Sequence, residues 1–409
     1  MDSRIYITGI GIISASGNGI EATEASVSGG ISGIGEIRYL STGHRSFPTG
    51  EVPYSNEELA AMAGVLPTED VRELRTVLLG IIAAREAMVS AGIGRAELLR
   101  TAFINGTTVG GMDYTERHFR ETLDKSVGGE GCKALVYNDC GSATDLIAKT
   151  LGSFSMHTTV STACSSAANA IIMGARMIKA GLVDRVVAGG TEGLSRFHLN
   201  GFNTLMILSE SRCRPFDKNH QGINLGEGAA YLVLERGESM KKRGARPLAE
   251  LMGYGNACDA YHQTATSAEG EGPFRAMSGA LKMAGLNPDD IDYVNCHGTG
   301  TPNNDASELA AMRRVWIGCR LPHYSSTKGL TGHTTSASGA IEAVISVLAL
   351  NEGFMPASAG CTEPMEEDYP PVMQTVRGCT LRYVMNNSFG FGGNDSSMIL
   401  RNMASGERE

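Results

Sequence analysis

The 409-residue sequence predicts an α/β fold, in which buried strands alternate with helices. Short apolar runs recur along the whole chain, and segments with helical periodicity separate them. Glycine contributes 52 residues, nearly twice the usual level of about 7%, and lies mostly beside the apolar runs. Two long segments, one after Cys164 and one at residues 334–350, contain mostly small and aliphatic side chains. Such segments are typical of buried helices that pack closely on their neighbours.

The first half of the chain begins with a strand at residues 4–14, in which Gly9 and Gly11 are expected to form a turn. An amphipathic pattern predicts a long helix at 69–92, begun by Pro67-Thr68-Glu69-Asp70 and ended by Gly92. The other strands predicted here lie at residues 101–105, 156–160, 184–190 and 229–235. The other helices lie at residues 20–29, 114–123 and 143–151 and directly after Cys164. Residues 236–246 are expected to form a basic helix or turn, and residues 106–111 a flexible turn.

The second half repeats this order of elements. Its predicted strands lie at residues 248–254, 292–296, 323–326, 381–386 and 396–400, and its helices at 272–284, 305–315 and 334–350. The helix at 334–350 mirrors the helix after Cys164, and we expect these two helices to pack on each other. We interpret the repeat as a pseudo-twofold duplication, with one half at residues 1–246 and the other at 247–409.

Composition and charge limit the classes of function. A formal net charge of −9 and a pI near 5.6 argue against general nucleic-acid binding. The nine cysteines are scattered and form no Cys-x-x-Cys pair, which disfavours a disulfide framework or a zinc site. No apolar run reaches the length of a membrane span, and the N-terminus runs straight into a strand. We therefore expect a cytoplasmic protein that binds neither membranes nor nucleic acids.

Cys164 lies between the strand at 156–160 and the small-residue helix that follows it. A cysteine at this position faces the free N–H groups and the positive end of that helix. This environment should lower the pKa of the thiol by roughly one unit from its usual value near 8.5. The alternative is a buried structural cysteine, which is the commoner fate of a free cysteine. The sequence therefore makes Cys164 a candidate nucleophile.

Two histidines lie in similar positions. His297 follows the strand at 292–296 and precedes a Gly-Thr-Gly-Thr-Pro run, and His333 precedes the helix at 334–350. Taken singly, each would be interpreted as a structural residue. Together with Cys164 they place three reactive side chains at strand ends of one α/β sheet system, where ligand sites gather. This combination favours an active site.

Four motifs of the chain resemble those of the β-ketoacyl-acyl-carrier-protein synthases. They are Thr162-Ala163-Cys164-Ser165-Ser166, His297-Gly298-Thr299-Gly300-Thr301-Pro302, Lys328-Gly329-Leu330-Thr331-Gly332-His333 and Asn387-Ser388-Phe389-Gly390-Phe391-Gly392-Gly393-Asn394. The resemblance runs along nearly the whole chain and is greatest to the elongating, Cys-His-His type of type II fatty acid and polyketide systems. It implies a thiolase-like fold, with two pseudo-twofold-related βαβαβαββ halves in a five-layered α/β/α/β/α core, usually as a homodimer.

The resemblance implies an acyltransferase, a 3-oxoacyl-[acyl-carrier-protein] synthase that extends a fatty-acyl, polyene or polyketide chain by decarboxylating Claisen condensation. Cys164 would take the acyl group from the phosphopantetheine of acyl carrier protein. His297 and His333 would donate ring N–H groups to the malonyl thioester and stabilise the enolate. The backbone N–H groups of Cys164 and Phe391 would form the oxyanion hole. No metal and no cofactor are implied, apart from the phosphopantetheine that carries the substrates.

Other residues match further positions of the family. Lys328 matches a lysine that pairs with a glutamate, here Glu342, and we leave open whether the pair is structural or catalytic. The residues that match phosphopantetheine-binding hydroxyls are Thr299 and Thr301. The residues that match the acyl pocket and its gate are Val109, Phe202, Phe389 and Phe391, and glycines around the last two should let their loop swing.

Acyl carrier protein is the expected partner of such an enzyme. Carrier proteins are acidic, so an enzyme with a net charge of −9 should carry a local basic patch. Arginines 72, 75, 212 and 214 lie in stretches that resemble docking regions. The alternative interpretation of these arginines is ordinary solvated charge.

Departures from the family pattern leave the substrate open. Asn394 stands where a threonine is frequent, and Thr108 replaces a common glycine in the pocket turn. The Ile223-Asn224-Leu225-Gly226-Glu227-Gly228 segment lacks the usual aromatic-aliphatic pair before Gly-Glu-Gly. A specialised paralogue that makes an unsaturated, aryl-polyene or polyketide-like chain is therefore a serious alternative.

Four rival interpretations are weaker. A thiolase would carry a second cysteine in the loop at 389–395, which has none, and an initiating synthase would carry asparagine in place of His333. A chain-length-factor-like partner, the non-catalytic subunit of a heterodimer, generally loses the nucleophile, whereas Cys164 is kept. A metal site at Cys296 and His297 is disfavoured, because adjacent residues on a strand point to opposite faces.

Overall fold

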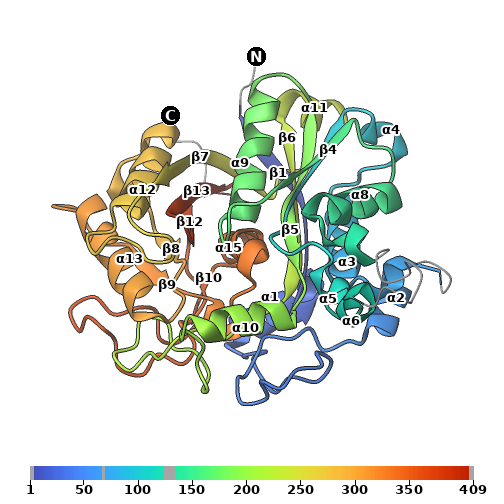
Figure 1. Cartoon of the computed structure of the whole chain (residues 1–409). Helices are drawn as coiled ribbons and strands as arrows, with labels where there is room; N and C mark the ends of the chain where they lie inside the picture. The colour runs from blue at the N-terminus through green and yellow to red at the C-terminus, as the bar shows by residue number, and fades with distance from the viewer. Residues whose placement is uncertain (1–3, 67–69, 124–133, 405–409) are drawn as a thin grey trace.

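The computed structural model describes residues 4–66, 70–123 and 134–404. Within these ranges an 11-stranded sheet runs in the order β4-β3-β5-β6-β1-β7-β13-β12-β8-β9, with β2 paired to β1 (Figure 1). The strands of its first half are β1 (Ile5–Ser14), β2 (Gly17–Asn18), β3 (Thr101–Gly106), β4 (Met156–Val160), β5 (Arg185–Glu192) and β6 (Gly228–Arg236). Those of its second half are β7 (Ala249–Cys258), β8 (Tyr293–Asn295), β9 (His323–Ser325), β12 (Tyr383–Gly390) and β13 (Asn394–Asn402). A separate two-stranded sheet joins β10 (Phe354–Met355) to β11 (Val376–Arg377).

The strand pairings of the two halves repeat each other. In the first half β1 is antiparallel to β6, β6 is antiparallel to β5, and β3 lies parallel between β5 and β4. In the second half β7, β13, β12, β8 and β9 follow in the same order with the same directions. The halves join where Tyr6 and Ile7 of β1 pair with β7. This repeat confirms the predicted α/β, thiolase-like fold.

The helices form three layers around the two half-sheets. The central layer contains α9 (Ser166–Lys179) and α15 (Ser338–Glu352), whose apolar side chains share one buried cluster with strands of both halves. The helices α3 (Arg75–Ser90) and α8 (Cys140–Leu151) cover the outer face of the first half. The helices α12 (Glu271–Ala284) and α13 (Pro302–Val315) cover the second, on the opposite side in Figure 1. The predicted five-layered order follows from this arrangement.

Successive side chains of one strand pack into different layers. Ile12 of β1 packs into the central cluster, whereas the next residue, Ile13, packs against α3. Val186 and Val187 of β5 divide in the same way. Since successive side chains of a strand point to opposite faces, strands with helices on both sides must be apolar at every position. This requirement explains the near-continuous apolar runs of the sequence.

Small residues let the central helices approach the sheet and each other. A Cβ added to Gly106 at the end of β3 would lie 2.6 Å from the backbone N of Ala167 in α9. A Cβ added to Gly339 in α15 would lie 2.8 Å from the Cβ of Ala168. Both distances are shorter than carbon and nitrogen atoms tolerate, so side chains at these positions would force the layers apart. The predicted close packing of the two small-residue helices is confirmed.

Gly9 and Gly11 do not form the predicted turn. The strand β1 continues through both residues, and its ladder shifts register between Ile7 and Gly9. A Cβ on Gly9 would lie 2.4 Å from the backbone oxygen of Ala87 in α3, and one on Gly11 would lie 2.2 Å from that of Ala83. The glycines therefore serve close helix–strand packing, which local sequence cannot distinguish from a turn.

The remaining helices differ in part from the predictions. The long helix begins at Arg75, after a 3₁₀ turn at Asp70–Glu73, and its predicted start at 67–69 lies outside the described residues. The predicted helix at 114–123 is two short helices, α5 (Met112–Thr115) and α6 (Phe119–Leu123). Two helices of eight or more residues were not predicted, α2 (Asn56–Ala63) and α10 (Arg196–Thr204). The helix α2 has a readable signal, because Ser55 and Glu58 form a capping box at its start.

Short elements complete the described chain. They are α1 (Ile20–Gly29), α4 (Arg95–Leu98), α11 (Gly237–Lys242), α14 (Lys328–Thr331) and 3₁₀ turns at Val136–Asn138, Pro288–Asp290 and Thr335–Ala337. Across the described ranges, no helix combines the length and the apolar character that crossing a membrane requires.

Candidate active site

Cys164 lies in a tight turn between β4 and α9, as the sequence predicts. The residue before it, Ala163, has a φ of 54°, a left-handed conformation that is uncommon for a residue with a side chain. The side chain of Ser166 braces this turn, because it accepts from the backbone N of Thr162 at 2.9 Å and donates to the backbone oxygen of Ala163 at 2.6 Å. Asn169 adds a bond to the hydroxyl of Thr162 at 2.9 Å. The small polar residues around Cys164 therefore hold a strained turn.

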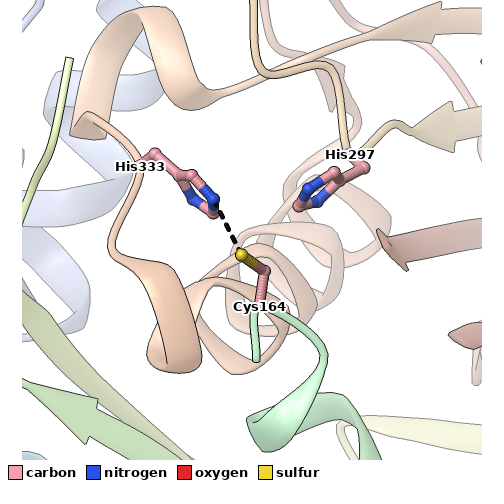
Figure 2. A group of neighbouring side chains, drawn as sticks. All are labelled: Cys164, His297 and His333. Atoms are coloured by element: carbon pink, nitrogen blue, oxygen red, sulfur yellow. Dashed lines mark hydrogen bonds between the residues drawn. The ribbon is translucent and has the colours of Figure 1, made fainter. Parts of the chain in front are cut away.

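Cys164 contacts His333, which comes from the other half of the chain. The Sγ atom of Cys164 lies 3.2 Å from Nε2 of His333, at the dashed line in Figure 2. The backbone of His333 is fixed by bonds to the neighbouring segment, in which its N donates to Asn224 at 2.7 Å and its oxygen accepts from Gly226 at 2.9 Å. Its other ring nitrogen, Nδ1, lies 2.9 Å from the hydroxyl of Ser338 at the start of α15. These contacts aim the imidazole at the thiol.

His297 completes the cluster from the end of β8. The rings of His297 and His333 lie 5.4 Å apart, nearly perpendicular, and both face the thiol (Figure 2). One ligand-type atom from each of Cys164, His297 and His333 lies within 4.8 Å of the other two. The structure thus brings together the three residues that the sequence predicts, although they lie far apart along the chain.

Lys328 connects His297 to Glu342. The ammonium of Lys328 contacts the carboxylate of Glu342 and donates to the backbone oxygen of His297. It also lies 3.3 Å from Nδ1 of His297. An ammonium has no acceptor capacity, so Nδ1 must accept, and the proton of the neutral ring must sit on Nε2. Lys328 therefore fixes His297 as an N–H donor toward the site.

Glu308 of α13 holds the loop that carries His297. Its two carboxylate oxygens accept from the backbone N of His297 at 2.9 Å and of Gly298 at 2.8 Å. Asn387 donates to the same carboxylate at 3.0 Å. Burial raises the pKa of Glu308, and these donors act against the shift. Glu308 and Ser338 are not predicted from the sequence, because nothing in the local pattern shows that either side chain turns toward a histidine.

Burial dominates the electrostatics of the cluster. It raises the pKa of Cys164 to about 12, although the charge of Lys328 and the backbone N–H of Phe391 act in the opposite direction. Burial and the charge of Lys328 lower the pKa values of His297 and His333 well below the usual range. The expectation that the helix end lowers the pKa of Cys164 is therefore wrong in direction, since desolvation outweighs the helix end. At neutral pH the cluster is a neutral thiol beside two neutral imidazoles.

A cavity of about 350 Å³ leads to these residues. Cys164, His297 and His333 line it, and so do Thr299 and Thr301, whose hydroxyls lie 2.8 Å apart. Other parts of the wall come from residues 264–266, 302–304 and 389–393. An elongated substrate in this cavity can therefore contact both hydroxyls and the thiol.

Phe202 and Phe391 both line this cavity. Their rings stack with centroids 5.9 Å apart and planes at 21°. Phe391 lies in the turn between β12 and β13, as predicted, but Phe389 is buried within β12, because the β12–β13 ladder extends to Gly390 and Asn394. Val109 is buried, and its N donates to Glu192 at 3.2 Å. It does not belong to the described lining of this cavity, and its acyl-pocket role stays a prediction.

The turn that carries Phe391 is followed by a buried carboxyl group. Asp395 is almost fully buried, and its Oδ2 has no hydrogen-bond partner among the described residues. Burial raises the pKa of Asp395 to about 8, and the nearby carboxylates of Asp259 and Glu308 add to this shift. Asp395 therefore holds its proton at neutral pH.

The predicted docking arginines have different environments. Arg75 is buried, and its guanidinium donates to both carboxylate oxygens of Glu227 at 2.8–2.9 Å. The prediction that Arg75 docks a carrier protein is therefore wrong. Arg72 and Arg212 are exposed and Arg214 is half-buried, and their docking role stays a prediction.

Comparisons with known proteins place this geometry in context. Residues 2–239 match the family model described as beta-ketoacyl synthase, N-terminal domain, and residues 248–362 match the C-terminal domain of the same family. The chain is 33% identical over 413 residues to 3-oxoacyl-[acyl-carrier-protein] synthase 2 of Staphylococcus aureus, with 98% of each chain covered. It is 32% identical to the enzyme of that name from Vibrio cholerae, covering 98% of this chain and 99% of the relative.

Two solved structures with a similar fold are ketosynthase complexes. One is described as the ishigamide ketosynthase/chain length factor, with a TM-score of 0.90, 33% identity, and coverage of 98% of this chain and 99% of the other. The other is a ketosynthase in complex with its chain length factor from Xenorhabdus doucetiae, with a TM-score of 0.80, 31% identity, and 98% of each chain covered.

Proposed function

The chain belongs to the β-ketoacyl synthase family, and from that premise we propose that it is a 3-oxoacyl-[acyl-carrier-protein] synthase that joins an acyl group on Cys164 to a malonyl unit delivered by acyl carrier protein. The observation that carries this proposal is the contact between Cys164 and His333, with His297 beside them in one cavity. A thiol, a base within hydrogen-bond reach and a fixed N–H donor are the groups that a decarboxylating condensation needs.

The first step transfers the acyl group. The Sγ atom of Cys164 attacks the thioester carbonyl while His333 takes the thiol proton on Nε2. The carrier thiolate leaves and takes a proton back from Nε2, so the histidine returns to its neutral form. A base beside the thiol is required, because burial raises the pKa of Cys164 to about 12 and leaves little free thiolate at neutral pH.

The second step forms the carbon–carbon bond. Malonyl thioester binds with its carbonyl oxygen near the two histidines, and the Nε2–H of His297, fixed by Lys328, stabilises the enolate as carbon dioxide leaves. Between the two steps Nε2 of His333 takes up the one proton that the overall condensation consumes, and this N–H assists as a second ring donor. The enolate carbon attacks the acyl carbonyl on Cys164. The backbone N–H groups of Cys164 and Phe391 stabilise the oxyanion. Cys164 leaves as the 3-oxoacyl product forms, and its sulfur takes the proton held on Nε2 of His333.

The cavity supports the proposed substrate carrier. Thr299 and Thr301 lie on its wall, and their hydroxyl groups can bond to the amides of a phosphopantetheine arm. Phe202 and Phe391 stack on each other in the lining of the cavity that also contains Cys164, and we assign them to the acyl gate. We propose acyl carrier protein as the partner and no cofactor beyond its phosphopantetheine.

We further propose that the enzyme forms a homodimer along β4. This strand pairs only with β3 among the described strands, and Met156 at its start is exposed. An unpaired edge strand invites association with a second chain.

The eight cysteines of the described residues are all unpaired, which supports a reducing, cytoplasmic location.

Intact-protein mass spectrometry tests the proposed function. The protein is incubated with acyl-carrier proteins that bear saturated, unsaturated or 3-oxo chains, and Cys164→Ser serves as the control. We expect an acyl adduct that depends on Cys164, and the chains that load will identify the pathway. A well-folded protein that takes no acyl group from any carrier would contradict the proposal.

A second candidate is a subunit of a heterodimeric ketosynthase/chain-length-factor pair in polyketide or aryl-polyene synthesis. The similarity to two structures described as such pairs favours it. Because this chain retains Cys164, His297 and His333, it would be the ketosynthase member. Native mass spectrometry of the purified protein decides between the two, since an active homodimer excludes an obligatory second subunit.

A further inference from the structure

The hydroxyl of Ser338 lies against the ring nitrogen of His333 that faces away from the thiol. We propose that Ser338, supported by Thr334, is a positioning residue that stabilises the charge His333 acquires when it takes the proton of Cys164. This inference rests on the proposed function. It adds Ser338 as a third residue to the thiol of Cys164 and its base, His333.

The contacts form one chain from the thiol into the start of α15. Cys164 Sγ lies 3.2 Å from Nε2 of His333, and Nδ1 of the same ring lies 2.9 Å from Oγ of Ser338. The hydroxyl of Ser338 lies 3.1 Å from that of Thr334. All four side chains are buried. Each nitrogen of the ring therefore has one partner, and Ser338 is the partner on the side away from the substrate.

The direction of the hydrogen bonds follows from the proton that moves. If Nε2 accepts the proton of Cys164, the neutral ring must begin with its own proton on Nδ1. That N–H donates to Oγ of Ser338, whose hydroxyl can in turn donate to Thr334. When Nε2 gains the thiol proton, the Nδ1–H bond becomes charge-assisted and about twice as strong. No proton leaves through Ser338, because Nε2 returns its proton to the departing thiolate.

His297 cannot act as the base that accepts the proton of Cys164. Its Nδ1 lies on the ammonium of Lys328, which donates and cannot accept. A second proton on His297 would place two positive charges in contact. The two histidines thus have different second partners, a cation for His297 and a hydroxyl for His333, and only the second arrangement can stabilise an imidazolium.

The groups around His333 disfavour a positive charge on its ring, so that charge needs stabilisation by a neighbouring acceptor. Burial, Lys328 of α14 and His198 of α10 all lower the pKa of His333. The other ionisable groups facing the cluster are His297 beside it and the carboxylates of Glu192 in β5 and Glu342 in α15, both of which raise the pKa of Cys164. Transfer of a proton from Cys164 to His333 is therefore unfavourable, and a neutral acceptor at Nδ1 reduces its cost without adding a further charge.

The test compares matched serine variants of the whole protein. The rate of acyl-enzyme formation is measured by intact mass at pH 7.5, with a small acyl-pantetheine thioester that needs no carrier protein. We expect Ser338→Ala to acylate about 10- to 100-fold more slowly, the equivalent of one charge-assisted hydrogen bond, and Ser338→Thr to recover most of the rate. Ser346→Ala is the control, because Ser346 is a buried serine of the same helix whose hydroxyl bonds to the backbone of Glu342.

The pH profile separates this role from a structural one. With His333 as an effective base, the acylation rate should be flat between about pH 7 and 9. In Ser338→Ala, deprotonation of the Cys164 thiol by hydroxide should become the faster route. The acylation rate should then rise with pH in that range. A variant that is merely less stable would lose active enzyme without a change of slope. If Ser338→Ala does not fold, Thr334→Val is used in its place. We expect this variant to lower the acylation rate by a smaller factor, about 3- to 10-fold.

Folded Ser338→Ala protein with an unchanged rate and a flat profile would overturn the inference. Failure of the wild-type protein to acylate would instead contradict the proposed function, so the two failures are distinguishable.

Discussion

The ammonium of Lys328 lies 3.3 Å from Nδ1 of His297 and also contacts the carboxylate of Glu342. This single group thereby connects a buried ion pair to the protonation of a ring in the active site. These contacts support both roles that the sequence leaves open, a structural ion pair with Glu342 and an influence on the tautomer of His297.

Removing this ion pair should impair decarboxylation more than acyl transfer. In Lys328→Met/Glu342→Gln both charges are lost together, which avoids leaving one buried charge unpaired. Without the ammonium, His297 is free to place its proton on Nδ1, and we expect malonyl decarboxylation to slow by about 10- to 100-fold. The measurement is carbon dioxide release from malonyl-carrier protein, with Glu342→Gln alone as the comparison. Equal losses in acyl transfer and decarboxylation would contradict the assigned role of Lys328.

The reactivity of Cys164 should depend on pH only when its base is removed. In the wild-type protein we expect alkylation by iodoacetamide to be nearly constant from pH 7 to 9, because neutral His333 takes the proton throughout this range. In His333→Ala the thiol must lose its proton to solvent. Burial raises the pKa of Cys164 to about 12, so the thiolate share and the rate should rise about tenfold per pH unit. A flat profile in the variant would show that another group is the base.

Asp395 should destabilise the protein as the pH rises. Its pKa is raised to about 8 by burial, Asp259 and Glu308, whereas an unfolded Asp has a pKa near 3.9. Between these values the folded state holds a proton that the unfolded state has lost, so stability decreases with increasing pH. We expect Asp395→Asn to be more stable than wild type by about 1–3 kcal/mol at pH 8, with the difference vanishing near pH 4. Urea unfolding at both ends of this range is the measurement, and parallel profiles would contradict the prediction.

The central layer should not tolerate a larger residue at Gly339. A Cβ there would lie 2.7 Å from Oγ of Ser388 and 2.8 Å from the Cβ of Ala168. We expect Gly339→Ala to lower the free energy of unfolding by about 1–3 kcal/mol, through overpacking. Gly201→Ala is the matched control, because a Cβ at this helical position meets no atom within 4 Å. The control should be neutral or stabilising by up to about 1 kcal/mol, and thermal unfolding of both variants tests the contrast.

Much of the fold follows from local patterns. The strands of the large sheet other than β2, and the two small-residue helices, lie close to their predicted positions, because their side chains must satisfy a sheet covered on both faces. The conformational role of Gly9 and Gly11 was mistaken, since a glycine needed for helix packing and one needed for a turn look alike in sequence. The split of the predicted helix at 114–123 into two has no local signal that we can identify.

The candidate site was predictable where a residue type itself carries chemistry. Cys164, His297, His333, Lys328 and Glu342 lie together as the motifs imply. The environment of these residues was not predictable. Burial, which raises the pKa of Cys164, is a property of the assembled layers, and the burial of Arg75 against Glu227 depends on a contact between distant segments. Local sequence contains neither kind of information.

The pseudo-twofold repeat also has a consequence for biosynthesis. Cys164 belongs to the first half of the chain, whereas His297, Lys328 and His333 belong to the second. At about 5–20 residues per second, a ribosome adds the first of these histidines on the order of ten seconds after the cysteine. During that interval the nascent chain carries the nucleophile without its base. The complete active site can therefore form only after translation has delivered both halves.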